Sequence, residues 1–176
     1  MILIGYDLST MDIMDKIDGY IDFKNHDCDF EYLGSDVANP PIADYVVSVD
    51  IPAVREKLCK LYNPINLIKG YLSKSAKVGW GNVIQRNAYV GPFAQIGNGC
   101  LINVGGQVNH EARLGDYSIV APGAIILGRV NVGKRVYIGA SAVILPDIKI
   151  ADDSVIGAGA VVTKDVSGKV KGVPAR

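Results

Sequence analysis

Cysteine and histidine are both scarce in this sequence. The three cysteines, Cys28, Cys59 and Cys100, are scattered and odd in number. This pattern argues against a disulfide framework and predicts a reducing, cytoplasmic location. The only histidines are His26 and His110, whereas a catalytic zinc site usually takes three protein ligands, often histidines. We therefore expect no metal, and the scarcity argues against a zinc enzyme of the carbonic anhydrase type.

Long apolar runs and an excess of charge of one sign are also missing. The first eight residues lack a basic leader and a long apolar segment, so we expect neither a signal peptide nor a membrane span. Acids and bases cancel over the whole chain, but residues 1–63 carry twelve acids and five bases, and residues 64–176 carry six acids and thirteen bases. Because these bases are spread out with few aromatics beside them, we expect an anionic small molecule or cofactor rather than nucleic acid.

What the sequence does contain is an aliphatic residue at every sixth position over ninety residues. Small residues are common two places before each aliphatic, and glycine is common directly after it. The sixteen aliphatic positions are Leu72, Val78, Ile84, Val90, Ile96, Ile102, Val108, Leu114, Val120, Ile126, Val132, Ile138, Ile144, Ile150, Ile156 and Val162. A fixed period of six is neither helical nor a simple strand alternation, so it predicts a repeat architecture.

Short strands, glycine corners and inward aliphatics describe the sides of a parallel β-helix. The pattern resembles the left-handed β-helix of hexapeptide-repeat proteins, in which three hexads form one triangular coil. The resemblance implies that residues eighteen apart are stacked at about 4.8 Å, the usual strand spacing. Sixteen hexads then make about five coils. Cys100 occupies a small inward position and should belong to the core.

The first sixty-three residues have a different pattern. Three apolar strands and one helix are expected there, at residues 2–5, 19–23, 45–49 and 52–62. They predict a small α/β domain over residues 1–63, which we interpret as a reduced Rossmann-like unit for the acceptor. The β-helix domain should cover residues 64–163. The tail, 164–176, loses the hexad and should leave the β-helix as a loop or cap.

His110 is the one histidine within the repeats, and Glu111 follows it directly. An exposed histidine that titrates near neutrality is a natural general base, and an adjoining carboxylate can hold its tautomer and raise its basicity. The eighteen-residue coil stacks Gly128 over His110 and Arg129 over Glu111. A glycine there leaves its N–H open to an incoming carbonyl oxygen, as an oxyanion donor requires. The alternatives are a plain surface histidine, an ordinary corner glycine and an Arg129–Glu111 surface pair.

The sequence around these residues resembles one family. Asn109-His110-Glu111 is the specific element. It is followed by the motifs Leu114–Tyr117, Ala121–Ala124, Ser154–Asp165 and Gly172–Arg176. These motifs are similar to those of the bacterial sugar O- and N-acyltransferases, which include sialic acid O-acetyltransferases and N-acetyltransferases of nucleotide-linked 4-amino sugars. The resemblance is strong over residues 64–176 and faint over residues 1–63.

The resemblance implies a homotrimer with acetyl-CoA in the groove between neighbouring β-helices. It implies that His110 is the general base, that Glu111 orients it, and that the N–H of Gly128 binds the thioester carbonyl. Ala140 and Ala158 match positions that line the pantetheine arm of the cofactor.

The resemblance also implies residues that bind the CoA phosphates and residues that bind the acceptor. Lys164 or another base of the tail would meet the CoA phosphates. Gly5 opens the turn at which relatives bind a nucleotide, and Asp22 matches an acidic position that contacts it. The turn after Gly5 lacks the glycine cluster that lets a backbone approach phosphates, and Phe23 replaces a second acid. Ile119 stands where relatives often have a second histidine, so the mode of acceptor binding stays open.

These residues predict an acetyl-CoA-dependent acetyltransferase acting on the amino group of a 4-amino-4,6-dideoxy sugar nucleotide, in cell-surface glycan biosynthesis. Direct transfer with His110 as the base requires no covalent intermediate. O-acetylation of a sugar or a sialic acid is the enzymatic alternative. A catalytically silent β-helix scaffold is the non-enzymatic alternative, because periodicity alone assigns architecture and not chemistry.

Overall fold

The computed structural model describes residues 1–5, 18–22, 31–33 and 43–172. Its amino-terminal part contains a parallel three-stranded sheet, in the order β2-β1-β3, and one helix. Their bounds are β1 (Ile2–Ile4), β2 (Gly19–Ile21), β3 (Tyr45–Val47) and α2 (Pro52–Tyr62). All three predicted strands and the predicted helix are confirmed. His26 and Cys28 lie outside the described residues, among which no helix is long and apolar enough to cross a membrane.

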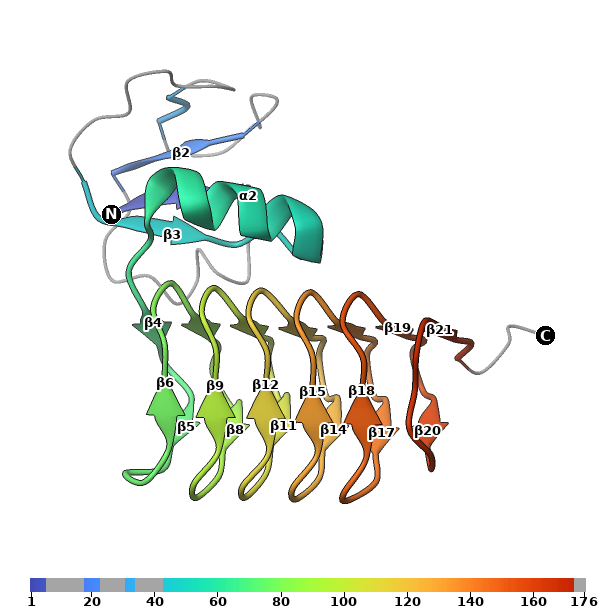
Figure 1. Cartoon of the computed structure of the whole chain (residues 1–176). Helices are drawn as coiled ribbons and strands as arrows, with labels where there is room; N and C mark the ends of the chain where they lie inside the picture. The colour runs from blue at the N-terminus through green and yellow to red at the C-terminus, as the bar shows by residue number, and fades with distance from the viewer. Residues whose placement is uncertain (6–17, 23–30, 34–42, 173–176) are drawn as a thin grey trace.

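The rest of the chain is a parallel β-solenoid of two-residue strands, which turn through three sheets in rotation (Figure 1). The first sheet contains β4 (Leu67–Ile68), β7 (Val83–Ile84), β10 (Leu101–Ile102), β13 (Ile119–Val120), β16 (Tyr137–Ile138), β19 (Val155–Ile156) and β21 (Lys169–Val170). The second contains β5 (Tyr71–Leu72), β8 (Tyr89–Val90), β11 (Gln107–Val108), β14 (Ile125–Ile126), β17 (Val143–Ile144) and β20 (Val161–Val162). The third contains β6 (Lys77–Val78), β9 (Gln95–Ile96), β12 (Arg113–Leu114), β15 (Asn131–Val132) and β18 (Lys149–Ile150).

Each strand pairs with the strand one coil away. In the first sheet Val83 pairs with Leu101, and Leu101 with Ile119, so the predicted eighteen-residue coil is confirmed. The sixteen hexads predict about five coils, and β4 and β21 extend the solenoid beyond both ends of that run. The last coil is shorter, because Lys169 pairs with Val155, fourteen residues before it. The tail that was expected to leave as a loop or cap therefore stays on the solenoid as far as Val170.

The aliphatic residues of the hexads fill the interior of the prism. Every sixth residue from Ile84 to Val162 is buried, whereas Leu72 and Val78 in the first coil are half-buried. Cys100 is fully buried among them, as predicted. Each buried aliphatic side chain contributes about 1.5–3 kcal/mol relative to exposure. The hexad pattern thus encodes the core directly.

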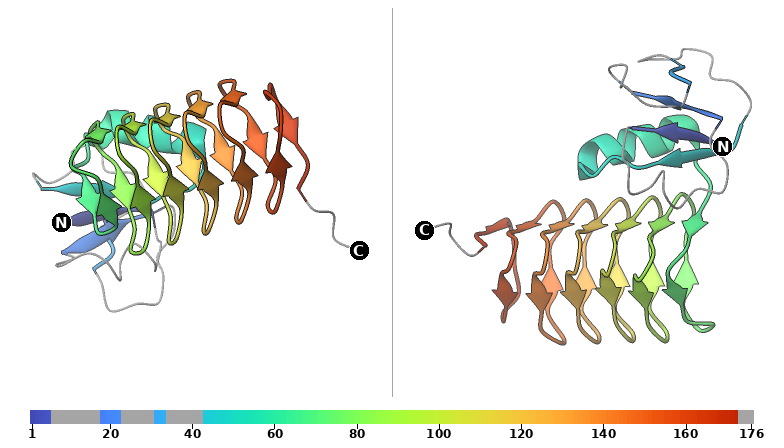
Figure 2. Two further views of the ribbon diagram at one scale, coloured as in Figure 1. Left: turned by 90° about the horizontal axis from the view of Figure 1, so that it is seen from below. Right: turned by 180° about the vertical axis from the view of Figure 1, so that it is seen from behind.

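The outer surfaces of the three sheets differ in what covers them. The first sheet lies under the amino-terminal strands (Figure 2), and we call its surface the covered face. Its outward side chains form one apolar cluster with those strands: Leu67, Val83, Leu101 and Ile119 against Leu3, Tyr20 and Val46. This packing joins the two parts of the chain.

The other two surfaces are open to solvent in the single chain. The second sheet presents mostly apolar residues, half-buried or exposed, and we call its surface the apolar face: Tyr71, Tyr89, Gln107, Ile125, Val143 and Val161. The third sheet presents only polar and basic residues, all exposed, and we call its surface the polar face: Lys77, Gln95, Arg113, Asn131 and Lys149. One repeat thus produces three faces of different chemistry.

Helix α2 lies along the edge between the third and first sheets, which we call the α2 edge, and a buried arginine fastens it there. The Arg55 guanidinium donates to Val47 O at 2.7 Å on β3, and to Gly99 O and to Cys100 O at 3.0 Å on the solenoid. Arg55 is fully buried, and this burial lowers its pKa from the ordinary value. Backbone carbonyls, rather than a carboxylate, therefore stabilise its charge.

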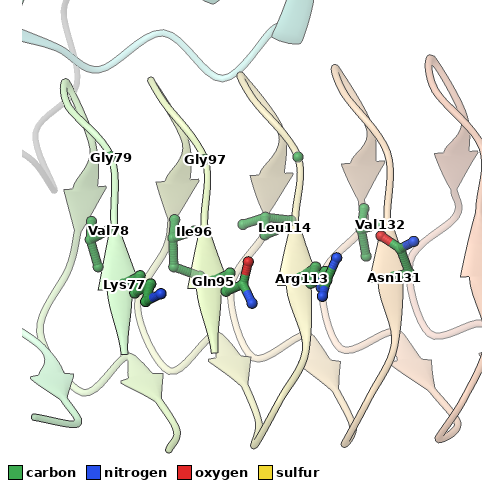
Figure 3. Close-up of a pocket in the computed structure, with 11 residues that line it drawn as sticks. Lys77, Val78, Gly79, Gln95, Ile96, Gly97, Arg113, Leu114, Asn131 and Val132 are labelled. Atoms are coloured by element: carbon green, nitrogen blue, oxygen red, sulfur yellow. The ribbon is translucent and has the colours of Figure 1, made fainter. Parts of the chain in front are cut away.

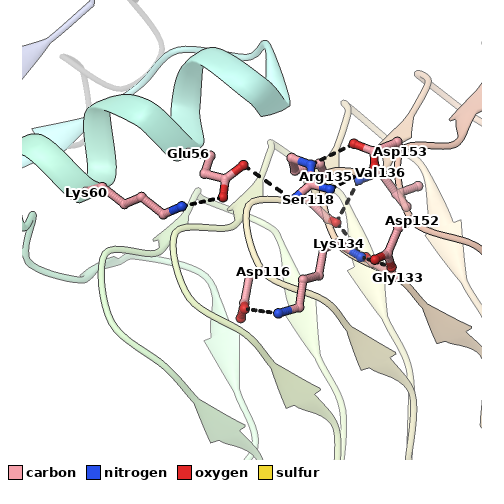
Figure 4. A network of polar contacts seen from close by, with 10 residues as sticks. All are labelled: Glu56, Lys60, Asp116, Ser118, Gly133, Lys134, Arg135, Val136, Asp152 and Asp153. Carbon is pink, nitrogen blue, oxygen red and sulfur yellow. Dashed lines mark hydrogen bonds and ion pairs between the residues drawn. The ribbon is translucent and has the colours of Figure 1, made fainter.

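A polar network lies outside Arg55 on the same edge (Figure 4). Glu56 of α2 accepts hydrogen bonds from Lys60 at 2.7 Å and from Arg135 at 3.4 Å. Arg135 also forms two hydrogen bonds with Asp153 on the next coil, at 2.6 and 2.8 Å. These bonds hold the pKa of Asp153 below its usual range.

Candidate active site

The turn from β11 to β12 carries Asn109, His110 and Glu111 at the edge between the second and third sheets, which we call the His110 edge. The Asn109 amide donates to Ile126 O on the next coil at 3.0 Å and so braces the turn. His110 Nδ1 lies 3.2 Å from Glu111 Oε2, and the two side chains are 51% and 54% exposed. An ionised carboxylate only accepts hydrogen bonds. Glu111 therefore favours the tautomer with hydrogen on Nδ1 and leaves Nε2 able to accept a proton.

Gly128 lies directly over His110 on the next coil, as the eighteen-residue spacing predicts. A Cβ added at Gly128 would overlap the imidazole, and His110 Cε1 and Nε2 would be its nearest neighbours. Among the described residues, the N–H of Gly128 has no hydrogen-bond acceptor. Its carbonyl oxygen accepts from the Asp147 N–H at 3.2 Å. The edge therefore places a free backbone donor beside the basic nitrogen of an imidazole.

Arg129 is stacked over Glu111 as predicted, but the two residues do not form the surface pair considered as an alternative. The Arg129 guanidinium pairs instead with Asp147, one coil further on, with Nε–Oδ1 at 2.7 Å and Nη2–Oδ2 at 2.8 Å. These hydrogen bonds hold the pKa of Asp147 below its usual range and raise that of Arg129. Glu111 consequently retains His110 as its partner.

Thiol and metal chemistry have no support among the described residues. Cys59 and Cys100 are free and buried, and burial raises the pKa of Cys100 to about 12. A thiol in that state is a poor nucleophile. The described part of the chain contains no group of three or more histidine, cysteine or acidic side chains that could hold a metal ion.

The residues expected to bind the cofactor lie on two different edges. Ala140 follows β16 and Ala158 follows β19, so both lie at the edge between the first and second sheets. Lys164 follows β20 and is exposed at the carboxyl-terminal end of the His110 edge. Within one chain the structure therefore does not bring Ala140 and Ala158 to His110. A single groove that holds all of them has to be formed by two chains.

Gly5 and Asp22 directly follow the neighbouring parallel strands β1 and β2, so both lie at the carboxyl edge of the small sheet. The Gly5 N–H donates to Ile21 O at 2.8 Å. Gly5 has a φ of 86° and a Cβ there would overlap Val49, so a side chain is disfavoured. Carboxyl edges of parallel sheets are the usual ligand sites in α/β units. The structure thus brings together the two residues that we expect to bind the acceptor.

The polar face contains a shallow hollow of about 440 Å³ (Figure 3), and its lining reaches the α2 edge at Gly79, Gly97 and Gly115. Its polar lining comes from four successive strands of the third sheet: Lys77, Gln95, Arg113 and Asn131. Arg113 lies three residues after His110 on the same coil. With two cations and no acid in this lining, the surface attracts anions.

Three residues were missed by sequence reasoning. The eighteen-residue spacing places Asp147 over Arg129, so that position was available from the sequence, but the pairing was not. Ser48 is buried and donates to Gly5 O at 2.9 Å, behind the carboxyl edge of the small sheet. Arg55 lies in a helix with no acid positioned against it, and no sequence signal shows its burial.

Residues 129–164 match a family model described as bacterial transferase hexapeptide (six repeats). No curated protein matches the chain. The whole fold is shared with solved structures. PerB from Caulobacter crescentus, in complex with CoA and GDP-perosamine, is 25% identical with a TM-score of 0.90, and the match covers 99% of this chain and 95% of PerB.

Two further structures have the same architecture. The acetyltransferase domain of PglB from Neisseria gonorrhoeae, in complex with acetyl coenzyme A, is 21% identical with a TM-score of 0.86, covering 94% of this chain and 91% of that domain. WeeI from Acinetobacter baumannii is 23% identical with a TM-score of 0.75, covering 99% of this chain and 97% of WeeI. The matched repeats and the shared fold confirm the predicted resemblance to hexapeptide-repeat acetyltransferases.

Proposed function

We propose that this chain, a hexapeptide-repeat protein of the acetyltransferase family, transfers the acetyl group of acetyl-CoA to the amino group of a sugar nucleotide of the 4-amino-4,6-dideoxy type. One observation carries the proposal. At the His110 edge, an imidazole oriented by Glu111 lies beside the free N–H of Gly128. A base and an oxyanion donor in one place are what acyl transfer to an amine requires.

In the proposed reaction, the amine nitrogen attacks the carbonyl carbon of the thioester while His110 Nε2 accepts a proton from that nitrogen. The Gly128 N–H donates to the carbonyl oxygen, on which negative charge develops. When the C–S bond breaks, the proton passes from His110 to the departing CoA sulfur. The new C–N bond replaces the C–S bond, so no covalent enzyme intermediate forms and the buried Cys100 takes no part.

The choice of acetyl-CoA as donor is supported by two similar structures, the PglB domain with acetyl coenzyme A and PerB with CoA. In this chain we assign Ala140 and Ala158 to the pantetheine arm and Lys164 to the CoA phosphates. Because Ala140 and Ala158 lie on a different edge from His110, these assignments require a groove between two chains. The donor site and the oligomeric state are therefore linked in this proposal.

We propose that the chain forms a homotrimer of left-handed solenoids through its apolar face. Tyr71 and Tyr89 stack there with ring centroids 5.3 Å apart, and Val161 at its far end is 62% exposed. A mostly apolar strip along the surface of a solenoid is typical of an interface. Val143→Asp places a charge in this strip and should convert trimers to monomers in sedimentation velocity. Asn131→Asp adds the same charge to the polar face and should leave the trimer intact; monomeric Asn131→Asp, or trimeric Val143→Asp, contradicts the assignment.

The acceptor is assigned to the carboxyl edge of the small sheet, where Gly5 and Asp22 meet. A nucleotide-linked sugar is supported by PerB, which was solved with GDP-perosamine. Cytoplasmic location remains a prediction from the low cysteine content. The polar face is compatible with this acceptor, because its hollow, lined by Lys77 and Arg113, attracts anions such as a sugar-linked diphosphate.

The decisive experiment is a thiol-release assay with acetyl-CoA and a panel of UDP-, GDP- and TDP-linked 4-amino sugars, each paired with its 4-hydroxy counterpart. We expect CoA release with at least one amino sugar and none with its hydroxy counterpart. Release with hydroxy sugars or sialic acid alone would overturn N-acetylation in favour of O-acetylation. No release with any acceptor, together with no thermal shift on adding acetyl-CoA, would identify a silent scaffold.

A further inference from the structure

Arg129 stands between two carboxylates in one column of the His110 edge. Phe93, Glu111, Arg129 and Asp147 follow one another at eighteen-residue intervals, all with φ between 58° and 65°. Because neighbouring coils are about 4.8 Å apart, Glu111 below and Asp147 above are backbone neighbours of Arg129 at similar distance. Arg129 pairs through two hydrogen bonds with Asp147. No ion pair joins Arg129 to Glu111 in the described structure.

The pairing of Arg129 with Asp147 rather than with Glu111 matters because Glu111 is the carboxylate that contacts His110. A carboxylate beside an imidazole favours its protonated form, and a cation placed on that carboxylate cancels the effect. If the Arg129 guanidinium turned down to Glu111, it would compete with His110 Nδ1 for the same oxygen atoms. The hydrogen bond that orients the imidazole would then weaken.

We propose that Asp147 is a positioning residue for the pair formed by His110 and Glu111. By holding Arg129 in a two-point contact, Asp147 keeps the guanidinium off Glu111 and leaves the Glu111 carboxylate to His110 Nδ1. The catalytic consequence rests on the proposed function, in which His110 is the base. Asp147 acts through Arg129 and Glu111, and its own charge also acts on His110 at longer range.

The charged groups around His110 make the sign of the effect predictable. At the positions stacked on His110 and Glu111, the coil below has Pro92 and Phe93, the coil above has Gly128 and Arg129, and the next coil has Pro146 and Asp147; Arg113 follows on the same coil as His110. The coil below thus contributes no charge. Besides the hydrogen bonds with Arg129, the charge of His110 contributes to the lowered pKa of Asp147. The charge of Glu111 likewise contributes to the raised pKa of Arg129. Removing Asp147 deletes a negative charge and frees a positive one, so both changes disfavour protonated His110.

The test is an NMR pH titration of the full chain, which is simple to assign because histidine is scarce. With only two histidines, the imidazole signals of His110 can be followed by NMR during a pH titration and assigned with a His26→Gln variant. Asp147→Asn should lower the His110 titration midpoint by about 0.2–0.7 pH unit, the range expected for an exposed charge pair. Arg129→Gln should raise it by a similar amount. The double variant should return close to the original midpoint.

The α2 edge offers a matched control. Arg135 and Asp153 are also eighteen residues apart and form the same two-point contact, at 2.6 and 2.8 Å. Asp153→Asn removes an equivalent pair on a different edge and should leave the His110 midpoint unchanged. An unchanged midpoint in Asp147→Asn, or an equal shift in Asp153→Asn, would overturn the positioning role.

A kinetic measurement separates this inference from the proposed function. The acid limb of the kcat/KM profile with acetyl-CoA should move in Asp147→Asn in the same direction as the NMR midpoint. If the NMR midpoint moves and the acid limb does not, the coupling between Asp147 and His110 holds and the assignment of His110 as the base is wrong. If neither the NMR midpoint nor the acid limb moves while His110→Ala is inactive, His110 remains assigned as the base and the positioning role of Asp147 is wrong.

Discussion

The His110 edge and the α2 edge carry the same turn in each coil and the same kind of ion pair. Arg129–Asp147 on the first and Arg135–Asp153 on the second have matching two-point geometry. Helix α2 packs over the second edge, where Arg135 also reaches Glu56 and its side chain is 27% exposed. The Arg129 side chain is 49% exposed. The same kind of ion pair therefore supports helix packing at the α2 edge, whereas at the His110 edge it borders an open site.

The inward positions of the two edges differ as well. Behind the His110 edge they are apolar: Ala94, Ala112, Val130 and Ile148. Behind the α2 edge they include polar residues that bond to the backbone of the next coil. Asn82 Oδ1 accepts from the Cys100 N–H at 2.7 Å, and Ser118 Oγ accepts from the Val136 N–H at 2.9 Å. The repeat tolerates both solutions, so it does not by itself assign a role to either edge.

The largest expected effect separates the edges by activity. His110→Ala should lower turnover about 10²–10⁴-fold, because it removes the general base, and should leave the melting temperature unchanged. Lys134→Ala, an equivalent truncation in a turn of the α2 edge, should keep near-normal turnover. Steady-state kinetics with acetyl-CoA and calorimetry provide both measurements. Near-normal turnover in His110→Ala contradicts the assignment of the base.

Stability, unlike activity, should depend more on the α2 edge than on the His110 edge. Arg55→Met leaves several buried carbonyl oxygens without a donor and should cost about 2–4 kcal/mol of unfolding free energy. For a chain of this size we expect a loss of roughly 5–15 °C in melting temperature. Lys57→Met, on the exposed side of the same helix, is the control and should melt like the parent. Equal melting of the two variants would show that Arg55 does not fasten α2.

A smaller effect tests the backbone donor at the His110 edge. Gly128→Ala places a Cβ against the imidazole of His110 and should reduce kcat about 10–10²-fold, by displacing the base and crowding the oxyanion position. Gly105→Ala adds a Cβ at a positive-φ turn with no neighbour closer than 3.9 Å. That control should retain its kcat. Similar losses in both variants would point to a general effect of glycine replacement.

The smallest effect concerns the thiols at the α2 edge. In a Cys28→Ser background, iodoacetamide at pH 8 should label neither Cys59 nor Cys100 in the folded protein, because both are buried and the pKa of Cys100 is about 12. After denaturation both should react, as counted by mass spectrometry. Labelling of Cys100 in the folded protein, with loss of activity, would reopen covalent catalysis.

Much of the site was predictable because the repeat acts as a ruler. Counting in sixes identifies the buried positions, and counting in eighteens places Gly128 over His110. The partner of Arg129 was not predictable in the same way. Glu111 and Asp147 are each one coil away from Arg129. Which of the two carboxylates pairs with Arg129 depends on a third group, because His110 already contacts Glu111. That competition exists only between side chains in three dimensions.

The sequence by itself determined the coil, its apolar bore and the stacking of the catalytic candidates, because each of these follows from a short-range period that every hexad repeats. Only the tertiary structure decided what lies against each face and edge. The docking of α2 buries Arg55 on one edge, while the chain leaves the edge of His110 open and the apolar face uncovered. The physical reason is that such packing joins segments of unrelated pattern, and no periodicity in either segment encodes their contact.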